Sequence, residues 1–259
     1  MRVPVLRGVI ERRILVNYRV DADVLARSLP PPFRPKLHRG HGLVGICLIR
    51  LRGVRPGCLP AGCGVASENA AHRTAVEWDE DGGVREGVYV RRRDTDSRLN
   101  ALAGGRIFPG IHSHSRFTVV ESGGHFEVAL RSDDGVTSLS VVGDVTDRLP
   151  ESSVFASLSE ASAFFRAGSL GYSATPDPRR FQGMELRCDR WQVEPLAVSA
   201  VRSSCFEDRS VFPRGSIEFD CALLMRDIGH EWHGQSDLCC VTQPAQEQAA
   251  ASVSVPGGS

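Results

Sequence analysis

The chain has 259 residues, and its 31 basic side chains balance 31 acidic ones, so the formal net charge is zero. This balance argues against a dedicated nucleic-acid binder or a protein that binds anionic membranes, because both need an excess of positive charge. Hydrophobic residues make up 41% of the chain and charged residues 24%, which is typical of a soluble globular protein and excludes disorder over the whole length.

No segment of the sequence predicts a membrane span or a secretion signal. The most apolar stretch, residues 43–49, is far shorter than the roughly 20 residues that cross a bilayer. Charges interrupt every apolar run near the N-terminus, so we expect a cytoplasmic protein without a membrane partner. The eight cysteines show no C-x-x-C spacing and are interpreted as reduced thiols, with Cys47 and Cys221 as small buried hydrophobes.

Two segments have the signals of short helices. Asp21 is a suitable N-cap for a helix over residues 21–29, which the three prolines at 30–32 then end. Ser157 and Glu160 form a capping box before a second helix, and Gly168 ends it. In this helix the apolar side chains that share one face are Ala161, Phe164 and Phe165.

Most of the remaining sequence has the period of two that is typical of strands. The clearest segments are residues 125–132, 137–145, 184–196 and 216–225, and glycine pairs or Asp-Gly at 123–124 and 134–135 predict hairpin turns. Many strands with two small helices predict an α+β domain that is mostly antiparallel β. We expect one domain over residues 1–233 and a disordered tail over 234–259, where the sequence loses its periodicity.

Histidines occur in two close pairs. His112 and His114 share one face of a predicted strand with Arg116, opposite Phe117, and a second pair lies at positions 230 and 233. The two pairs could build a metal site only if they met in space, and such spacings are common by chance. The prediction is therefore that the protein holds no metal and needs no cofactor.

A segment rich in ionisable residues extends from 67 to 96. A turn at residues 81–83 predicts a hairpin with one polar face, which inside a barrel would form a pocket for an acid and outside would be a solvated surface. The candidates before the turn are Glu68, His72 and Arg73, and those after it are Glu86, Tyr89 and Arg91.

Three consecutive arginines, Arg91 to Arg93, form the only basic run. Asp94 and Asp96 follow at once, which argues against a nucleic-acid patch. Strand alternation predicts that Arg92 points to the opposite face from its two neighbours, and an inward arginine could hold a carboxylate through its bidentate fork. None of the common catalytic motifs is present, neither a G-x-S-x-G elbow nor a P-loop, a dinucleotide fingerprint or H-E-x-x-H.

The segment ERRILVNYRVDADVLARSLPPPFRP, residues 11–35, resembles the opening of proteins in the acetoacetate decarboxylase-like superfamily. It is most similar there to the uncharacterised YqjF-like family, the 2071 domain of unknown function. The similarity continues through GLVGICLIRLRGVRP, SENAAHRTAVEW, GVYVRRRDTDSRLNALAGGRIFPG, FFRAGSLGYSATP and WQVEPL. This resemblance implies a cone-shaped, mostly antiparallel β-barrel with an interior ligand cavity, and a homo-oligomer.

The resemblance does not carry over the best-known chemistry of that superfamily. In acetoacetate decarboxylase a lysine within a Tyr-Pro-Lys-Lys segment forms a Schiff base with the β-keto acid. The corresponding stretch here, VYVRRRDTDSRLNA, contains no lysine, and Lys36, the only lysine of the chain, does not match the motif. Arginine cannot replace it, because its guanidinium stays protonated and is a poor nucleophile.

The sequence therefore predicts an enzyme of lyase or isomerase type that acts on a small carboxylated or carbonyl-bearing metabolite by acid/base chemistry without a Schiff base. A non-catalytic small-molecule-binding protein and a metal-assisted hydrolase that uses the histidine pairs are the alternatives. The candidate catalytic residues are Tyr89, His114, Glu68 and Glu86. The candidate substrate-binding residues are Arg91, Arg93, Arg116 and His72.

Overall fold

The computed structural model describes residues 4–104 and 109–240, and within these ranges the strands form a single sheet. The long strands are β1 (Leu6–Asp21), β4 (His41–Pro56), β5 (Val65–Glu80), β6 (Gly83–Thr95) and β13 (Ile217–Gly234). The shorter strands are β2 (Arg34–Pro35), β3 (Leu37–His38), β7 (His112–Ser122), β8 (His125–Ser132), β9 (Ser138–Val145), β10 (Leu170–Ala174), β11 (Arg180–Cys188), β12 (Glu194–Ser203) and β14 (Leu238–Cys239). The helices are α1 (Ala22–Ser28), α2 (Arg98–Ala103) and α3 (Leu158–Ala167), with a 3-10 turn, η1, at Ala61–Cys63.

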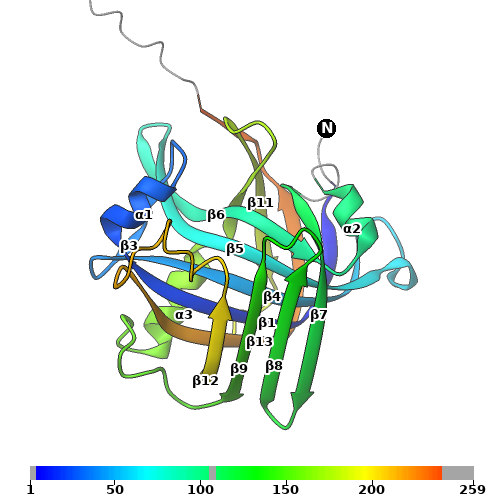
Figure 1. The fold of residues 1–259 in the computed structure, drawn as a ribbon. Coiled ribbons are helices and arrows are strands. Elements are labelled where there is room, and N and C mark those ends of the chain that lie inside the picture. The colour runs from blue at the N-terminus through cyan, green and yellow to red at the C-terminus, as the bar shows by residue number, and fades with distance from the viewer. Residues whose placement is uncertain (1–3, 105–108, 241–259) are drawn as a thin grey trace, which may run out of the picture.

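The sheet closes on itself twice, because β6 and β13 each pair with more than two strands. One closed ring follows the order β6-β7-β8-β9-β12-β13-β1-β4-β5, and the other follows β6-β10-β11-β13-β1-β4-β5. The long strands are common to both rings. Figure 1 shows β7, β8, β9 and β12 standing upright across the long strands, which run from side to side behind them. The predicted strand-rich α+β architecture is confirmed.

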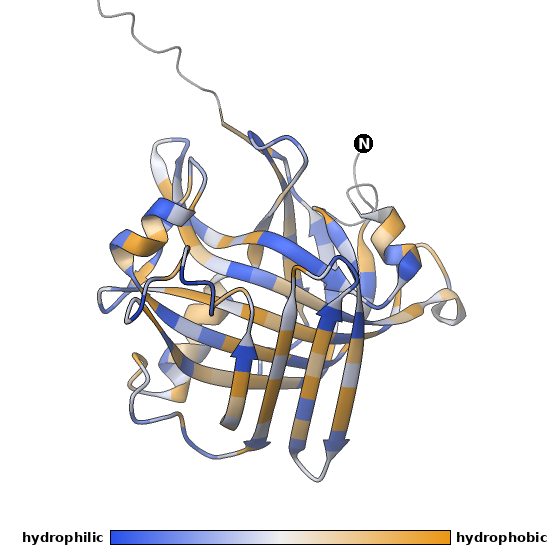
Figure 2. Cartoon of the chain, viewed as in Figure 1, coloured by the Kyte–Doolittle hydropathy of each residue, from blue (hydrophilic) through white to orange (hydrophobic). Residues whose placement is uncertain are grey.

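Side-chain alternation on the shared strands gives each ring its own core. On β1, Ile14 and Val16 enter the first core with residues of β8 and β9, whereas Leu15 enters the second core with Phe165 of α3. The upright strands in Figure 2 alternate between apolar and polar residues, as expected where one face is buried. The central parts of β1, β4 and β13 are buried on both faces, and there the sequence runs apolar, at residues 14–16, 43–48 and 221–225.

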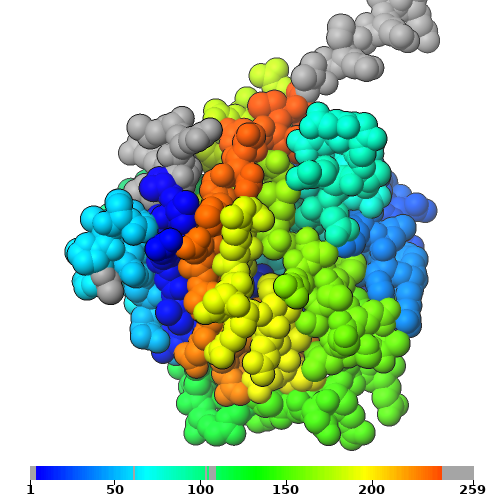
Figure 3. All heavy atoms as spheres, turned by 180° about the vertical axis from the view of Figure 1, so that it is seen from behind, coloured from blue at the N-terminus to red at the C-terminus, as the bar shows by residue number. Residues whose placement is uncertain are grey.

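Helix α3 covers the second core and follows the predicted signals. The Ser157 hydroxyl oxygen accepts a hydrogen bond from the Glu160 amide at 3.1 Å, while the Glu160 carboxylate accepts from the Ala156 amide instead of from Ser157. Phe165 is buried, and Gly168 is the C-cap. Figure 3 shows the molecule from behind. The chain from α3 to the start of β12, yellow-green to yellow, covers the surface beside β13, which is orange.

Removal of the α3 cap is expected to have a measurable effect on stability. Ser157→Ala is expected to lower the free energy of unfolding by about 1 kcal/mol, because the Glu160 amide loses its partner. Ser159→Ala, an exposed position in the first turn of the same helix, is the control and should change stability by less than about 0.5 kcal/mol. Urea titrations followed by tryptophan fluorescence measure both values. Equal losses in the two variants would contradict the capping role.

The first and middle helices differ in how well the sequence predicts them. Asp21 caps α1 as predicted, accepting hydrogen bonds from the amides of Asp23 and Val24, both at 3.0 Å. Helix α2 was not predicted. It has only six residues and does not bury an apolar face, since Leu99 and Leu102 are exposed, so the helical period that signals an amphipathic helix is missing.

One predicted strand was wrong in its extent. Residues 184–196 were expected to form one strand, but β11 ends at Cys188 and β12 begins at Glu194. Between them the Trp191 indole N–H donates to the Ser162 hydroxyl on α3 at 3.1 Å, and the Asp189 amide donates to the Gly229 carbonyl. These contacts turn the chain out of the sheet. Both halves pair with β13, but at different places along it, and their other partners differ, β10 for β11 and β9 for β12.

The expected tail lies only partly within the described residues. Within residues 234–240, β14 pairs with β11 through Leu238 and Phe181, and residues 241–259 lie outside the described part of the chain. In the described ranges no helix is long and apolar enough to cross a membrane.

Candidate functional site

A cavity inside the second ring brings together three arginines from different strands. Arg13 comes from β1, Arg73 from β5 and Arg93 from β6, and all three line a cavity with a solvent-accessible volume of about 80 Å³. The apolar part of its wall includes Ile49, Ala71, Met184, Leu186, Trp191 and Trp232. An adjoining cavity of about 50 Å³ shares Arg93 and Trp232 and adds His112. This is a small, largely apolar chamber with a concentrated positive charge.

A β-bulge in β6 directs Arg93 into the cavity. In the pairing with β5, His72 is opposite Arg92 but Arg73 is opposite Val90, so Arg91 is the extra residue. Because of this extra residue, Val90 and Arg93 share the cavity face. The prediction that Arg92 alone points away from its neighbours was therefore wrong. Arg91 contacts Cys205, and Arg92 contacts Asp94, which lines the adjoining cavity together with Arg93. Neither Arg91 nor Arg92 lines either cavity.

The cavity arginines are held by neutral groups. Arg93 donates from Nη2 to the Ser173 hydroxyl at 3.0 Å, and Arg73 donates to the Asn17 side-chain oxygen. Arg13 reaches the Cys47 sulfur at 3.4 Å. Within the described residues, no carboxylate oxygen pairs with any of the three guanidiniums, and Nε of Arg13 and of Arg73 has no hydrogen-bond partner.

Burial makes this unpaired charge costly. It lowers the pKa of Arg93 to about 10 and also lowers the pKa of Arg73, because a guanidinium out of water is less stable in its charged form. Guanidiniums in proteins stay protonated near neutral pH, so the cavity carries positive charge. Aromatic faces give partial compensation, since the Arg73 guanidinium carbon lies 4.9 Å from the centre of the Phe165 ring. An anion in the cavity would compensate the charge fully.

Cys47 lies at the same cavity and responds to its charge. Burial by itself raises the pKa of the Cys47 thiol, but the positive charges of Arg13 and Arg73 outweigh this and lower it. Cys221 lies in the same apolar core, but the pKa of its thiol is shifted in the opposite direction. Burial raises it, and the negative charge of Asp220 raises it further. Both cysteines were interpreted as small buried hydrophobes, but of the two only Cys47 lines the arginine cavity.

His112 supplies a neutral imidazole at the adjoining cavity. Burial, followed by the charge of Arg93, lowers the pKa of His112 to about 4, so the ring is uncharged near neutral pH. Its Nδ1 lies 3.3 Å from the Gly110 carbonyl oxygen.

The four predicted catalytic residues lie outside the lining of these cavities. Tyr89 is buried in an aromatic cluster with Phe33, where burial raises the pKa of its hydroxyl. Glu86 is exposed and pairs with Lys36 at 2.6 Å. The other two also have partners within the protein: Glu68 is held by Arg12 at 2.5 Å and by Arg50 at 2.6 Å, and His114 pairs with Asp133 at 2.7 Å.

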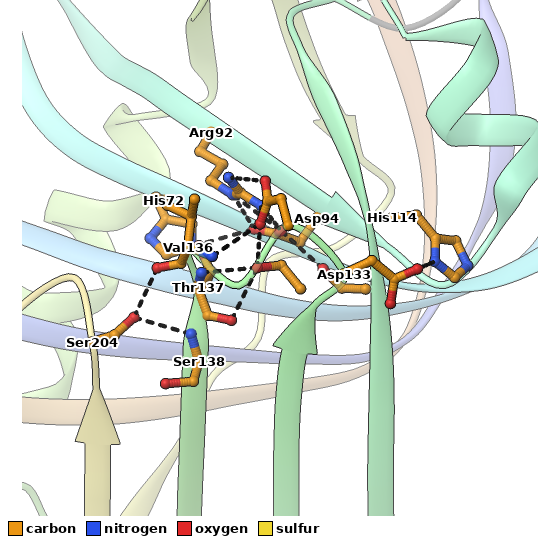
Figure 4. Close-up of polar contacts among 12 residues, drawn as sticks. His72, Arg92, Asp94, His114, Asp133, Val136, Thr137, Ser138 and Ser204 are labelled. Carbon is orange, nitrogen blue, oxygen red and sulfur yellow. Dashed lines mark hydrogen bonds and ion pairs between the residues drawn. The ribbon is translucent and has the colours of Figure 1, made fainter.

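Of the four predicted substrate-binding residues, Arg93 alone lines the cavity described above. Arg116 has a side chain that is 85% exposed, near Asp133. Arg91 contacts Cys205 at 2.7 Å. His72 lies 3.4 Å from Asp94 in a polar cluster with Arg92, and Figure 4 shows this cluster well separated from His114.

Sequence reasoning missed Arg13 and Cys47, and it noted Arg73 without assigning it to the site. Arg13 lies in the segment that carries the family resemblance, but nothing local distinguishes it from Arg12. Their parity on β1 decides the difference, because Arg12 points toward Glu68 and Arg13 toward the cavity.

The histidine pairs do not form a metal site in the described residues. His230 packs against Trp232 with ring centroids 4.4 Å apart, while His114 is bound to Asp133. No group of three or more His, Cys, Asp or Glu side chains within residues 4–104 and 109–240 is arranged to hold a metal ion.

The architecture is that of acetoacetate decarboxylase-like proteins. An acetoacetate decarboxylase from Legionella pneumophila superposes with a TM-score of 0.56 at 11% identity, covering 90% of this chain and 87% of the other. An acetoacetate decarboxylase-like enzyme from Sphingomonas wittichii gives 0.54 at 11% identity, over 92% and 94%. The enduracididine biosynthesis enzyme MppR, complexed with pyruvate, gives 0.54 at 13% identity, over 92% and 91%. At these identities the similarity establishes the fold.

The family assignment is more specific. Residues 9–218 match the DUF2071 model, described as an uncharacterized conserved protein, and the chain belongs to this family. No curated protein matches the chain significantly. The resemblance to this family and the predicted fold are thus confirmed.

Proposed function

We propose that the arginine cavity binds a small metabolite with a carboxylate and a carbonyl group, and that the protein acts on it by acid/base chemistry without a Schiff base. One observation carries this proposal: Arg13, Arg73 and Arg93 converge on one cavity and have no carboxylate partner in the described residues. Such buried charges are costly unless an anion pairs with them.

The arrangement suits a carboxylate with a second polar group nearby. A guanidinium can donate two parallel hydrogen bonds to one carboxylate, which fixes the orientation of the ligand. A further arginine can then stabilise negative charge on a carbonyl oxygen as it develops. The apolar wall, with Ile49, Met184 and Trp191, excludes water and strengthens both interactions.

Two cavity groups are suited to exchange protons with such a substrate. The lowered pKa of Cys47 increases its thiolate fraction, and His112 is a neutral imidazole that can accept a proton. Lys36 does not line the cavities and instead pairs with Glu86, with its amine 4.7 Å from the centre of the Phe164 ring. This position agrees with a mechanism that uses no imine.

A non-catalytic binding protein is the second candidate. The predicted acid/base residues Tyr89, Glu86, Glu68 and His114 all lie outside the cavity lining, which favours binding over turnover. Incubation with pyruvate and acetoacetate followed by proton NMR distinguishes the two, because only an enzyme converts the bound compound.

The proposal predicts carboxylate-dependent binding. Pyruvate and acetoacetate are expected to bind in isothermal titration calorimetry, whereas their neutral methyl or ethyl esters should bind at least about tenfold more weakly. Arg93→Gln is expected to weaken carboxylate binding by about 10- to 150-fold, because a charge-assisted hydrogen bond contributes about 1.5–3 kcal/mol.

Arg116→Gln is the matched control, since this arginine is exposed, and its affinity should equal that of the unmodified protein. Circular dichroism and thermal melting verify that both variants are folded. Equal affinity for acids and esters, or an unchanged affinity in Arg93→Gln, would refute the proposed site.

A further inference from the structure

Cys205 occupies a second site, in which three separate segments of the chain meet. It lies two residues after the end of β12 and is only partly exposed. Its sulfur lies 2.7 Å from Nη2 of Arg91, the bulge residue of β6, and the buried imidazole of His72 on β5 is close enough to interact electrostatically with the thiol. Neither Cys205 nor His72 lines the arginine cavity.

A buried carboxylate lies close to the imidazole of His72. His72 is 5% exposed, and its Nε2 lies 3.4 Å from Oδ2 of Asp94, which is fully buried. Asp94 is fixed in turn, because it accepts a hydrogen bond from the Ser115 hydroxyl at 2.9 Å and pairs with Arg92 at 2.8 Å. Figure 4 shows Arg92 and His72 gathered around Asp94.

This order of groups, thiol to imidazole to buried carboxylate, is the one that activates a nucleophile. The carboxylate orients the ring and stabilises its charged form, and the charged ring favours a thiolate at Cys205. Two residues earlier, the buried Ser203 hydroxyl has no hydrogen-bond partner and is available as a further donor.

The charged groups around the site favour a thiolate at Cys205 and a protonated ring at His72. Burial alone would raise the pKa of Cys205 and lower the pKa of His72, but the interaction of the two groups with each other, and with Arg91 and Asp94, reverses both shifts. The raised pKa of Tyr18 on β1, caused by burial and then by Glu207, keeps its hydroxyl neutral. The remaining charged groups nearby are Arg92, Asp134, Glu207 and Asp208.

We propose that Cys205, His72 and Asp94 form a nucleophilic thiolate site. Its substrates are small electrophiles, namely hydroperoxides, which oxidise the cysteine. In this step the thiolate sulfur attacks one hydroperoxide oxygen, the S–O bond forms and the O–O bond breaks. The leaving oxygen takes the proton of the His72 imidazolium, so the sulfur is oxidised to a sulfenic acid and the hydroperoxide is reduced to water or an alcohol.

Site-resolved alkylation of the full chain tests the proposal. The protein is treated with limiting iodoacetamide between pH 6 and 9.5, and the rate at each cysteine is read from peptide mass spectra. At pH 6.5 Cys205 should react at least about tenfold faster than Cys58, which is fully accessible, whereas Cys221 should not react in the folded protein. With hydrogen peroxide and dimedone, the sulfenic acid adduct should appear at Cys205.

Two variants assign the effect to the neighbouring groups. His72→Gln should lower the rate at Cys205 about tenfold at pH 6.5 but little at pH 9.5, where the thiol ionises without help. Because His72 is buried, Arg91→Gln provides the same test at an exposed position, and Arg91→Lys should restore part of the rate. A rate at Cys205 that rises with pH in parallel with Cys58, or an absence of labelling in the folded protein, would overturn the proposal.

Discussion

Glu68→Gln is expected to lower the free energy of unfolding by about 3–5 kcal/mol, because it leaves a buried arginine without the more buried of its two carboxylate partners. Arg12 is 1% exposed, and its Nη2 lies 2.5 Å from the Glu68 carboxylate. The same carboxylate holds Arg50 at 2.6 Å. Glutamine keeps the shape but not the charge, so Arg12 would keep only Glu121 as an anionic partner.

Urea titration at pH 7 measures this loss, and Glu194→Gln is the matched control. Glu194 pairs with Arg226 at 2.6 Å, but both side chains are more than a third exposed, so its removal should cost less than about 1 kcal/mol. Arg12→Met combined with Glu68→Gln should be less destabilised than the sum of the two single variants. Additive losses, or equal losses in Glu68→Gln and Glu194→Gln, would show that the buried pair is not coupled as described.

Acidification from pH 6.5 to pH 4 is expected to destabilise the fold by several kcal/mol. Burial, followed by a cavity arginine, lowers the pKa of His112 and the pKa of His230 from 6.5 to about 4. Between these pH values the unfolded chain binds protons that the folded chain does not, so stability falls as the pH falls. Each histidine accounts for about 3 kcal/mol at full effect.

One buried group opposes this trend. The pKa of His72 is raised, so its contribution favours the folded state as the pH falls through that range. The lowered pKa of Asp94 adds a loss of stability only at lower pH, below the ordinary range of an aspartate. The net slope between pH 6.5 and 4 is therefore dominated by His112 and His230.

Urea unfolding at half-unit steps from pH 7.5 to pH 4 measures this slope. His230→Gln should remove about half of the loss, because glutamine does not titrate. His41→Gln changes an exposed histidine and should leave the slope unchanged. A stability that is independent of pH between 6.5 and 4, or the same slope in His230→Gln, would contradict the assignment.

The candidate site shows where local pattern and tertiary structure diverge. Strand alternation placed Arg91 and Arg93 together, but the bulge at Arg91 separates them, so that one contacts Cys205 and the other Ser173. A single extra residue reverses the face of every later side chain, and no sequence signal in the run of arginines reveals it.

Burial of β6 on both faces explains why the predicted catalytic residue Tyr89 does not line the cavity. Tyr89 and Val90 face opposite sides of β6, but both sides are covered, one by the aromatic cluster and the other by the second core. A polar face on this hairpin was therefore the wrong expectation at these positions. The double closure of the sheet produces the second covering layer, and closure depends on pairings between distant segments.

By itself the sequence determined the α+β class, the caps of α1 and α3, the hairpins of the upright strands and the absence of a matching Schiff-base lysine. These features depend on neighbouring residues, whose periodicity and turn chemistry are local. Only the tertiary structure decided that Arg13, Arg73 and Arg93 share a cavity and that Cys205 meets His72. These residues are 20 to 133 positions apart, and strand register and the bulge in β6 bring them together.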